Sequence, residues 1–162
     1  VRIVEAEIAE PKSFNTLRSV RGGVLMQDSD EDPEHDWTVA TDVEPTDEQW
    51  SAIKLAWAII PHVKSNAIVV CSDKRLLGVG AGQMNRVQSV RLALEQAGDL
   101  AEGAVLGSDA FFPFPDSIET AAKAKIGAVV QPGGSKKDDD VIAEANKSCI
   151  PMVLTGVRHF RH

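Results

Sequence analysis

Two glycine-rich segments have the residue types that suit the binding of a small anion. The first, GVGAGQMNR, spans residues 78–86, between an apolar run and a segment with helical periodicity. The second, GGSKK, spans residues 133–137 and has the same kind of position. Glycines let a backbone approach a ligand, and a helix N-terminus favours negative charge. Because both segments would follow strands, where open α/β sheets bind ligands, they predict a small anionic ligand.

A purely structural turn explains residues 78–86 more simply when that segment is considered alone. It lacks the complete dinucleotide-binding spacing and the Lys-Ser or Lys-Thr ending of a phosphate-binding loop. The prediction of an anionic ligand therefore depends also on a basic cluster at the end of the chain, formed by Arg158, His159, Arg161 and His162. None of these features alone identifies a reaction.

A third segment, SDAFFPFPD at residues 108–116, concentrates aromatic side chains in a chain that has few. The sequence has five Phe and no Tyr, yet Phe111, Phe112 and Phe114 are clustered here. Two Pro residues are interleaved with them and an Asp lies on either side. Because Pro fixes φ and removes a backbone donor, the segment cannot be a regular helix. It predicts a stiff, acid-flanked loop.

Asn66, in KSNAIVV, directly precedes an apolar run that predicts a strand. Two interpretations stay open: a turn residue that bonds its own backbone, or an amide at the strand mouth that donates to a carbonyl and accepts from an amine. Zinc chemistry has little support, because the four His are scattered and no Cys-x-x-Cys occurs. A hydrolytic triad lacks its Gly-x-Ser-x-Gly elbow.

Strands and helices must alternate to position these segments. The first 45 residues are rich in expected strands, at 1–8, 22–28 and 37–41. Thr46 and Gln49 have the spacing of a helix start. Further strands are expected at 67–71, 76–80, 104–107, 127–131 and 151–155. Further helices are expected at 85–96, 118–125 and 138–147. This alternation predicts a layered α/β fold with a mainly parallel centre.

Bulk properties indicate an ordinary globular protein. The chain has 162 residues, of which 43% are hydrophobic and 25% charged, and no apolar run approaches the length of a membrane span. Of the net charge of −7, six negative charges belong to residues 28–36, which leaves −1 for the remainder and no basic face for nucleic acid. Cys71 and Cys149 are expected to be free buried thiols of a cytoplasmic protein.

Several blocks in order resemble one known family. They are RSVRGGVLMQDSD, HVKSNAIVV, GVGAGQMNRVQSVRLA, SDAFFPFPDSIETAAKA, QPGGS and the terminal TGVRHFRH. Together they resemble the C-terminal part of the bifunctional purine-biosynthesis family, in which IMP cyclohydrolase is fused to AICAR transformylase. The resemblance implies a three-layer α/β/α sandwich similar to the cytidine-deaminase fold, without its zinc site. It also implies a β-rich segment at residues 1–45 that packs on a core at residues 46–162.

Members of that family transfer a formyl group from 10-formyltetrahydrofolate, a co-substrate, to the 5-amino group of AICAR. Transfer to a poor amine nucleophile requires a base, stabilisation of the developing oxyanion and orientation of two substrates. It requires no metal and no prosthetic group. The resemblance further implies a cytoplasmic homodimer with active sites at its interface, and neither a nucleic acid nor a membrane as partner.

The resemblance implies three AICAR contacts. Asn66 resembles an amide that contacts AICAR near the reacting formyl group and could orient it. Phe111 resembles a wall against the AICAR base, where a flat aromatic face buries a heterocycle at low entropic cost. Arg158 resembles an arginine that reaches AICAR, and a charge-assisted hydrogen bond to its 5′-phosphate suits a guanidinium.

Five folate contacts are also implied. Phe114 resembles a wall on the folate side, and Arg86 resembles a residue beside the folate. Asp116 matches a contact that accepts hydrogen bonds from the pterin amino and ring N–H groups. Ser135 and Lys136 match a loop that holds folate, in which Lys136 could face the folate carboxylates. Phe112 is better explained as a hydrophobic plug over the core.

Some family features are doubtful or missing here. Ser65 with Asp109 is a weak candidate for a monovalent-cation site, as in some members. Pro115 stands where the family often has Arg or another charged residue, and Pro61 where it has Lys, but neither position is expected to be catalytic. The family's catalytic Lys-His pair lies upstream of the matched blocks, so this chain is expected to have no catalytic base of its own and to form a half-site.

Two alternatives to the transformylase assignment stay open. One is a non-catalytic ligand-binding or dimerisation module of the same fold, which the missing Lys-His pair favours. The other is a generic nucleotide-binding enzyme, against which the absence of a Gly-x-Gly-x-x-Gly motif counts.

Overall fold

The computed structural model describes residues 15–28, 30 and 37–161. The chain divides into two compact units, Val1–Asp32 and Pro33–His162. The strand expected at residues 1–8, most of the acidic segment 28–36 and the terminal His162 lie outside the described residues.

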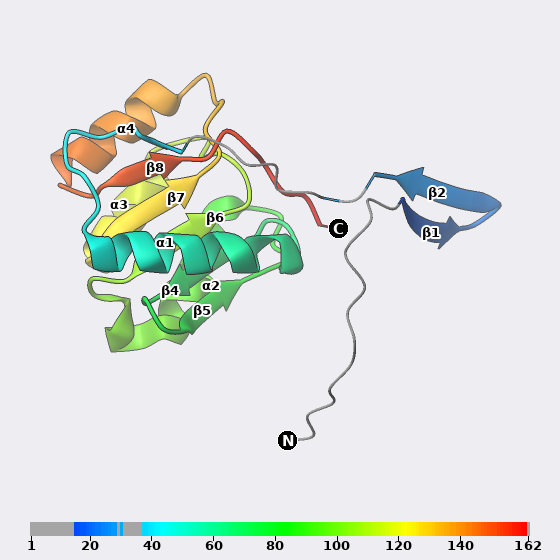
Figure 1. The fold of residues 1–162 in the computed structure, drawn as a ribbon, viewed down its shortest axis with the longest axis horizontal. Helices are drawn as coiled ribbons and strands as arrows, with labels where there is room; N and C mark the ends of the chain where they lie inside the picture. The colour runs from blue at the N-terminus through cyan, green and yellow to red at the C-terminus, as the bar shows by residue number, and fades with distance from the viewer. Residues whose placement is uncertain (1–14, 29, 31–36, 162) are drawn as a thin grey trace. The chain divides into compact units, whose positions relative to one another are not determined.

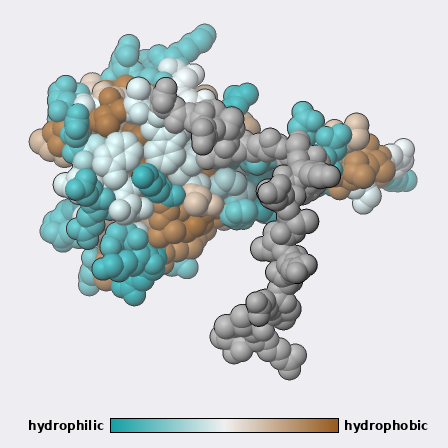
Figure 2. Space-filling view, in the orientation of Figure 1, coloured by the Kyte–Doolittle hydropathy of each residue, from teal (hydrophilic) through white to brown (hydrophobic). Residues whose placement is uncertain are grey.

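In the first unit, β1 (Thr16–Val20) and β2 (Gly23–Gln27) form an antiparallel hairpin (Figure 1). Gly22 closes the turn with a φ of 87°, which glycine adopts without a steric penalty. All ten strand residues are exposed, and Figure 2 shows a hydrophobic patch on the hairpin. The most exposed large apolar side chains there are Leu17, Val24 and Met26.

Over residues 37–161, the second unit has one six-stranded sheet and four α-helices. The strands are β3 (Thr38–Val39), β4 (Ile68–Cys71), β5 (Leu76–Gly80), β6 (Val105–Ser108), β7 (Ala128–Gln131) and β8 (Met152–Leu154). The helices are α1 (Asp47–Ile59), α2 (Arg86–Ala97), α3 (Asp116–Lys123) and α4 (Asp138–Lys147), with short 3-10 helices η1 (Ile60–His62) and η2 (Gly98–Ala101).

The sheet is mixed, with strand order β3-β8-β7-β6-β4-β5. The three strands β6, β7 and β8 are parallel, whereas β3, β4 and β5 join by antiparallel pairing. The expected parallel centre is therefore confined to β6–β8. Only residues 72–75 connect β4 to β5, and so short a connection permits only antiparallel pairing, because parallel strands need a long crossover.

The second unit is built as three layers. Alternate residues of β4 point to opposite faces: Ile68 and Val70 belong to the apolar core that α2, α3 and α4 cover, and Val69 and Cys71 to the core under α1. Figure 1 shows α1 crossing one face of the sheet. The structure is thus an α/β/α sandwich, and its relation to cytidine deaminases stays a prediction.

Helix starts follow the local chemistry of the sequence. Thr46 accepts a hydrogen bond from the Gln49 amide while the Gln49 side chain accepts one from the Thr46 amide, so the predicted capping box of α1 is confirmed. Helix α4 has the predicted bounds. Helix α3 begins two residues earlier than predicted, because Pro115, with a φ of −67°, already has helical geometry at the N-cap.

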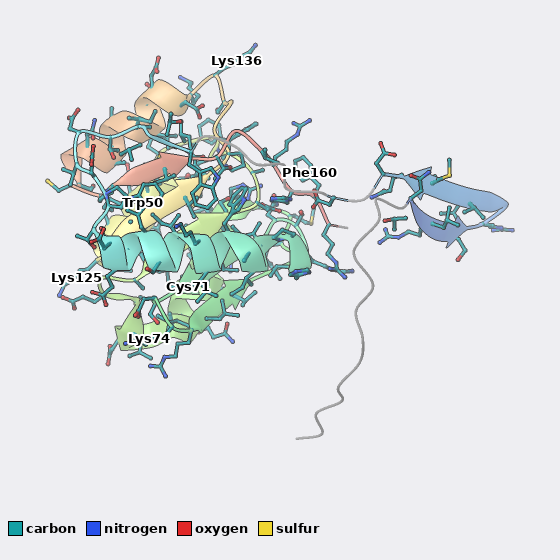
Figure 3. All side chains as sticks on the ribbon, viewed as in Figure 1. Trp50, Cys71, Lys74, Lys125, Lys136 and Phe160 are labelled. Carbon is teal, nitrogen blue, oxygen red and sulfur yellow. The ribbon has the colours of Figure 1, made fainter. Side chains whose placement is uncertain are left out.

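The expectation that both cysteines are buried is wrong for one of them. Cys71 in β4 is fully buried beneath α1 (Figure 3), but Cys149 is exposed. Cys149 lies in the turn after α4 with a φ of 53°, and the neighbouring Ile150 takes the core position instead.

The two-residue strand β3 is an edge strand of the sheet, where Thr38 pairs with Leu154. The proposed division of the chain after residue 45, with residues 1–45 packed on the core, stays a prediction. None of the described helices is long and apolar enough to cross a lipid bilayer.

Candidate functional site

A pocket of about 420 Å³ lies at one edge of the sheet of the second unit. Four segments that are distant in sequence line it: Asn66, the start of α2, residues 110–117 and the C-terminal segment. The topology explains why they meet. The N-terminal end of β4 pairs with the C-terminal ends of β5 and β6, since Ile68 lies opposite both Gly80 and Ser108. Strand β8 runs parallel to β7 and β6, so the residues after β8 arrive at the same edge.

The structure brings six of the eight predicted ligand contacts together around this pocket. They are Asn66, Arg86, Phe111, Phe114, Asp116 and Arg158. Ser135 and Lys136 follow β7 and do not line it. In Figure 3, Lys136 lies near the start of α4 and far from Phe160, which does line the pocket.

The loop at residues 133–137 is organised by its own helix. Asp138, the first residue of α4, accepts hydrogen bonds through Oδ2 from the amides of Gly134 (2.6 Å) and Ser135 (3.1 Å). The Ser135 hydroxyl accepts one from the Lys137 amide at 3.1 Å, and the Lys136 side chain is exposed. Lys136 therefore belongs to the exposed surface at the start of α4, outside the pocket lining.

The three clustered phenylalanines have different environments. Phe112 is fully buried in the core, which agrees with its interpretation as a plug. Phe111 is half-buried and Phe114 is 59% exposed, and both line the pocket. The Phe112 amide donates to the Oε1 atom of the buried Gln131 at 2.9 Å, which anchors the loop to β7. The buried Phe112 and its hydrogen bond to Gln131 thus fix the loop that carries Phe111 and Phe114 at the surface.

Arg86 is the first residue of α2 and is only 9% exposed. Its Nη1 donates to the Asp109 carboxylate and, at 2.8 Å, to the Ser108 hydroxyl. Its Nη2 donates to Oδ1 of Asn66 at 2.9 Å. Burial of an unpaired guanidinium would be costly, so the carboxylate of Asp109 compensates its charge. The guanidinium is a fixed edge of the pocket.

Both ends of the Asn66 amide are engaged. Oδ1 accepts from Arg86, and Nδ2 donates to the backbone carbonyl of Gln83 at 2.7 Å. The Asn66 carbonyl accepts from the Ser89 hydroxyl at 2.8 Å. The structure therefore favours the side-chain amide at a strand mouth over the turn residue that bonds its own backbone. One N–H and one lone pair of the amide remain for a ligand.

The C-terminal segment brings an arginine and an aromatic ring to the pocket. The Arg158 guanidinium carbon lies 5.3 Å from the centre of the Phe160 ring, a cation–π geometry. Both side chains are exposed and line the pocket. Arg158 is thus a cation at the rim, suited to meet an anionic group of a ligand.

Asp116 is the first residue of α3 and lines the pocket. Its Oδ1 accepts a hydrogen bond of 2.8 Å from the Ser117 amide. Within the described residues, no hydrogen bond or ion pair of Asp116 involves its other oxygen, Oδ2. A carboxylate oxygen on an exposed side chain at a pocket edge can accept from an N–H group of a ligand.

The weak candidate for a cation site at Ser65 and Asp109 has a different arrangement. The Ser65 hydroxyl donates to Oδ2 of Asp109 at 2.6 Å, while Arg86 pairs with Oδ1. A guanidinium beside the carboxylate repels a second cation, so the described geometry does not favour one there.

Several features of the pocket were missed from sequence. Phe160 lines it next to Arg158, and its place two residues further along the terminal segment was an available signal. Met84 in the first glycine-rich segment is fully exposed at the rim. The buried supports Gln131 and Ser108 gave no sequence signal, because each is a single polar residue at the end of an apolar strand.

A second pocket, of about 320 Å³, lies at the other end of β4 and β6, where Cys71 and Asp73 line it. Burial raises the pKa of the Cys71 thiol to about 11. A thiol with so high a pKa is protonated at neutral pH and is a poor nucleophile. Cys71 is therefore not an activated nucleophile in this pocket.

Taken together, the second unit is a three-layer α/β/α domain with an aromatic and arginine-lined pocket at one edge of a mixed sheet. Residues 1–96 match the model of a protein family described as AICARFT/IMPCHase bienzyme. The chain belongs to this family.

Similar proteins cover nearly all of the chain. It is 56% identical over 149 residues to the bifunctional purine biosynthesis protein PurH of Synechococcus elongatus, covering 91% of this chain and 29% of that protein. It is 54% identical over 164 residues to PurH of Trichodesmium erythraeum, covering 100% and 32% respectively. It is 53% identical over 150 residues to PurH of Bacillus subtilis, covering 90% and 29%. The chain thus spans less than a third of the length of these relatives.

Among solved structures, form 2 of Acinetobacter baumannii RibD is similar with a TM-score of 0.44 and 21% identity, over 64% of this chain and 33% of that one. A likeness at this level does not define the fold more closely than the layers described above.

Proposed function

We propose that this chain is the C-terminal part of an AICAR transformylase and supplies substrate contacts for formyl transfer from 10-formyltetrahydrofolate to AICAR. One observation carries the proposal: six of the eight contacts that the family resemblance implies line a single pocket, although four separate segments contribute them. The match of residues 1–96 to the AICARFT/IMPCHase family supports the same function.

The transfer exchanges one carbon–nitrogen bond for another. The 5-amino nitrogen of AICAR attacks the formyl carbon, and a tetrahedral oxyanion forms. The bond from that carbon to N10 of the folate then breaks, the amine loses a proton to a base, and N10 gains a proton. The reaction needs close orientation of the two substrates, which a pocket with fixed walls provides.

The pocket divides between the two substrates. Arg158 binds the 5′-phosphate of AICAR, Phe111 stacks on its base, and Asn66 orients the reacting groups with its remaining N–H and lone pair. On the other side, Phe114 covers the folate and Asp116 accepts from its pterin N–H groups.

Three further folate contacts lie at the edge of the pocket or outside its lining. Arg86, fixed by Asp109, contacts the folate at the pocket edge. Ser135 and Lys136 lie outside the pocket lining, so we assign them to the distal carboxylates of the folate, which carry negative charge that Lys136 complements.

The chain forms a half-site in this scheme. Among the described residues that line the pocket, none is His or Lys, the residue types of the family's catalytic pair. We assign the base to the Lys-His pair that the family carries upstream. The same observation favours a second candidate function, a ligand-binding or dimerisation module that does not catalyse turnover.

We also propose that the protein acts in the cytoplasm as a homodimer, with no metal in the reaction. Its ligands are AICAR and 10-formyltetrahydrofolate, and neither nucleic acid nor a membrane is a partner. Because the chain spans less than a third of its relatives, the cyclohydrolase activity of the family is assigned to the remainder of the longer protein.

Calorimetric titration of the folded chain tests the proposal. AICAR is titrated first, and a non-transferring 10-formyltetrahydrofolate analogue is then titrated in its presence. We expect both to bind, and we expect Lys123→Ala, an exposed α3 substitution away from the pocket, to leave both affinities unchanged. A folded chain that binds neither ligand at millimolar concentration would contradict the proposal that this pocket carries substrate-binding energy.

A further inference from the structure

One buried carboxylate supports the pocket without lining it. Asp109 follows β6 directly, is 1% exposed and is absent from the pocket lining. Its Oδ1 pairs with Arg86 and its Oδ2 accepts from Ser65. Its backbone amide donates to the carbonyl of Ala67 at 3.2 Å, and its carbonyl accepts from the His159 amide at 2.9 Å.

These contacts reach both sides of the pocket. Through Arg86, Asp109 fixes the guanidinium that in turn holds Oδ1 of Asn66. Through its own carbonyl it holds His159, the residue between the two pocket side chains Arg158 and Phe160.

A second link ties the C-terminal segment to the same carboxylate. The Ser65 hydroxyl, which donates to Asp109, accepts from the Arg161 amide at 3.2 Å. The Ser65 amide donates to the Arg161 carbonyl at 2.8 Å. Residues 158–161 are therefore fixed to Asp109 at two points.

We propose that Asp109 is a positioning residue, which holds Arg86 and Asn66 on one side of the pocket and the segment bearing Arg158 and Phe160 on the other in binding geometry. The effect of Asp109 on ligand affinity rests on the proposed function, because it is measured as AICAR binding. The effect of Asp109 on the positions of the pocket side chains does not rest on that function. A carboxylate is required at this place because Arg86 is buried, and loss of the negative charge would leave an uncompensated cation in the protein interior.

The first test uses the ligand-free chain and compares it with Asp109→Asn. In the parent protein the Arg86 guanidinium donates to three acceptors, so we expect its rotation to be slow and its Nη signals to be resolved in ¹⁵N NMR spectra. We expect these signals to collapse in Asp109→Asn and the side-chain amide protons of Asn66 to exchange faster. A folded Asp109→Asn protein with an unchanged Arg86 spectrum would overturn the proposal.

The second test is a double-mutant cycle on AICAR affinity, measured by calorimetry. We expect Asp109→Asn to weaken AICAR at least about tenfold in the parent protein, and less than about threefold in an Arg86→Gln background, where no buried cation remains. Equal losses in both backgrounds would show that Asp109 acts only on the general fold, and would overturn the proposal. Glu102→Gln, which removes an exposed ion pair with Lys125, is the control and should change neither measurement.

A variant with a smaller change covers the case in which Asp109→Asn does not fold. Ser65→Ala removes one hydroxyl, so we expect the Arg161 amide to exchange with solvent faster while the His159 amide, bonded to the Asp109 carbonyl, stays protected. Unchanged exchange at Arg161 would contradict the link from Asp109 to the C-terminal segment. If the wild-type chain binds no AICAR, the proposed function fails, whereas the spectra of the ligand-free chain still decide the positioning role of Asp109.

Discussion

At the scale of single residues, Phe112 and Phe114 lie two positions apart in the aromatic loop but have different roles. Phe112 is placed to stabilise the fold, and Phe114 is placed to contact a ligand. Phe112 has no exposed surface and packs in the core that α2, α3 and α4 cover, whereas Phe114 is 59% exposed at the pocket. Burial of a Phe side chain stabilises the fold through both transfer from water and close packing. An exposed ring at a pocket rim adds little to the stability of the fold, because it is neither removed from water nor closely packed. It contributes to binding when a ligand covers it.

The two rings therefore predict opposite effects. Phe112→Ala should lower the free energy of unfolding by about 3–5 kcal/mol, because it leaves a cavity in the core. Phe114→Ala should change that free energy by less than about 1 kcal/mol and should instead weaken binding of the folate analogue. Urea denaturation and calorimetry on both variants check this. A Phe114→Ala variant as unstable as Phe112→Ala would show that the outer ring is structural.

The two thiols predict a second contrast. Cys149 is exposed and should react with a maleimide at pH 8 within minutes, whereas Cys71, buried and with its pKa raised to about 11, should react only on unfolding. Mass spectrometry of peptides from the labelled protein locates the adduct. Rapid labelling of Cys71 in the folded chain would contradict the packing of α1 on β4.

The raised pKa also has a consequence for stability. Between pH 9 and 11 the unfolded chain releases the Cys71 proton while the folded chain retains it, so the free energy of unfolding should fall as the pH rises. This decrease should be smaller in Cys71→Ala, which removes the group. Denaturation curves at pH 8 and pH 10.5 on both proteins measure the difference, and identical pH dependences would contradict burial of the thiol.

Sequence reasoning located many residues of the pocket but not the interactions between them. Recognisable local motifs contain four of the pocket residues, namely Asn66, Arg86, Phe111 and Arg158. The ion pair of Arg86 with Asp109 joins α2 to the end of β6, and a single sequence holds no signal for such a tertiary contact.

At the scale of elements, α2 packs against β5 at van der Waals distance because β5 has glycines. A Cβ on Gly80 would lie 1.9 Å from the Ser89 carbonyl oxygen, and one on Gly78 would lie 2.0 Å from that of Ala93. Since α2 carries Arg86 at its first turn, and Ser89 holds the Asn66 carbonyl, the glycines of β5 indirectly place two pocket residues.

Gly80→Ala should therefore impair both stability and binding. We expect a loss of about 1–3 kcal/mol in the free energy of unfolding from the forced shift of α2, together with weaker AICAR binding. Thr46→Ala is the matched comparison, because it should also cost about 1 kcal/mol by removing the cap of α1, yet it is remote from the pocket lining. If Gly80→Ala lowers stability but leaves AICAR affinity unaltered, the packing of α2 on β5 does not place the pocket residues, which would contradict this account.

Elements with strong local signals were predicted well, and those set by tertiary context were not. The capping box of α1 and the bounds of α4 follow from side chains next to the helix ends. The mixed order of the sheet follows only in part: the short connection at residues 72–75 implies antiparallel β4 and β5, whereas the antiparallel pairing of β4 with β6 is a tertiary contact. The exposure of Cys149 likewise depends on the turn before β8, in which Cys149 itself has a positive φ.

At the scale of the whole molecule, the described apolar core belongs entirely to the second unit. Every fully buried hydrophobic residue that the structure describes lies between Ala52 and Val153, and the hairpin strands contribute none. Because the described hairpin strands contribute no buried side chain, we expect the second unit to form its core without them.

A chain of residues 33–162 should accordingly fold without the first 32 residues. We expect its ¹H–¹⁵N NMR spectrum to overlay that of the full chain for residues of the sheet and of α1–α4, and its AICAR affinity to be unchanged. Loss of dispersed signals on truncation would contradict the division into two units.

The central claim is that one pocket binds two different substrates through different residues, and crossed substitutions test it most directly. Calorimetry on the folded chain would compare Arg158→Ala and Asp116→Ala for AICAR and for the 10-formyltetrahydrofolate analogue. We predict that Arg158→Ala weakens AICAR by at least about tenfold more than it weakens the analogue, and that Asp116→Ala does the reverse. Equal losses of both ligands in each variant would contradict the assignment of these residues to separate substrates.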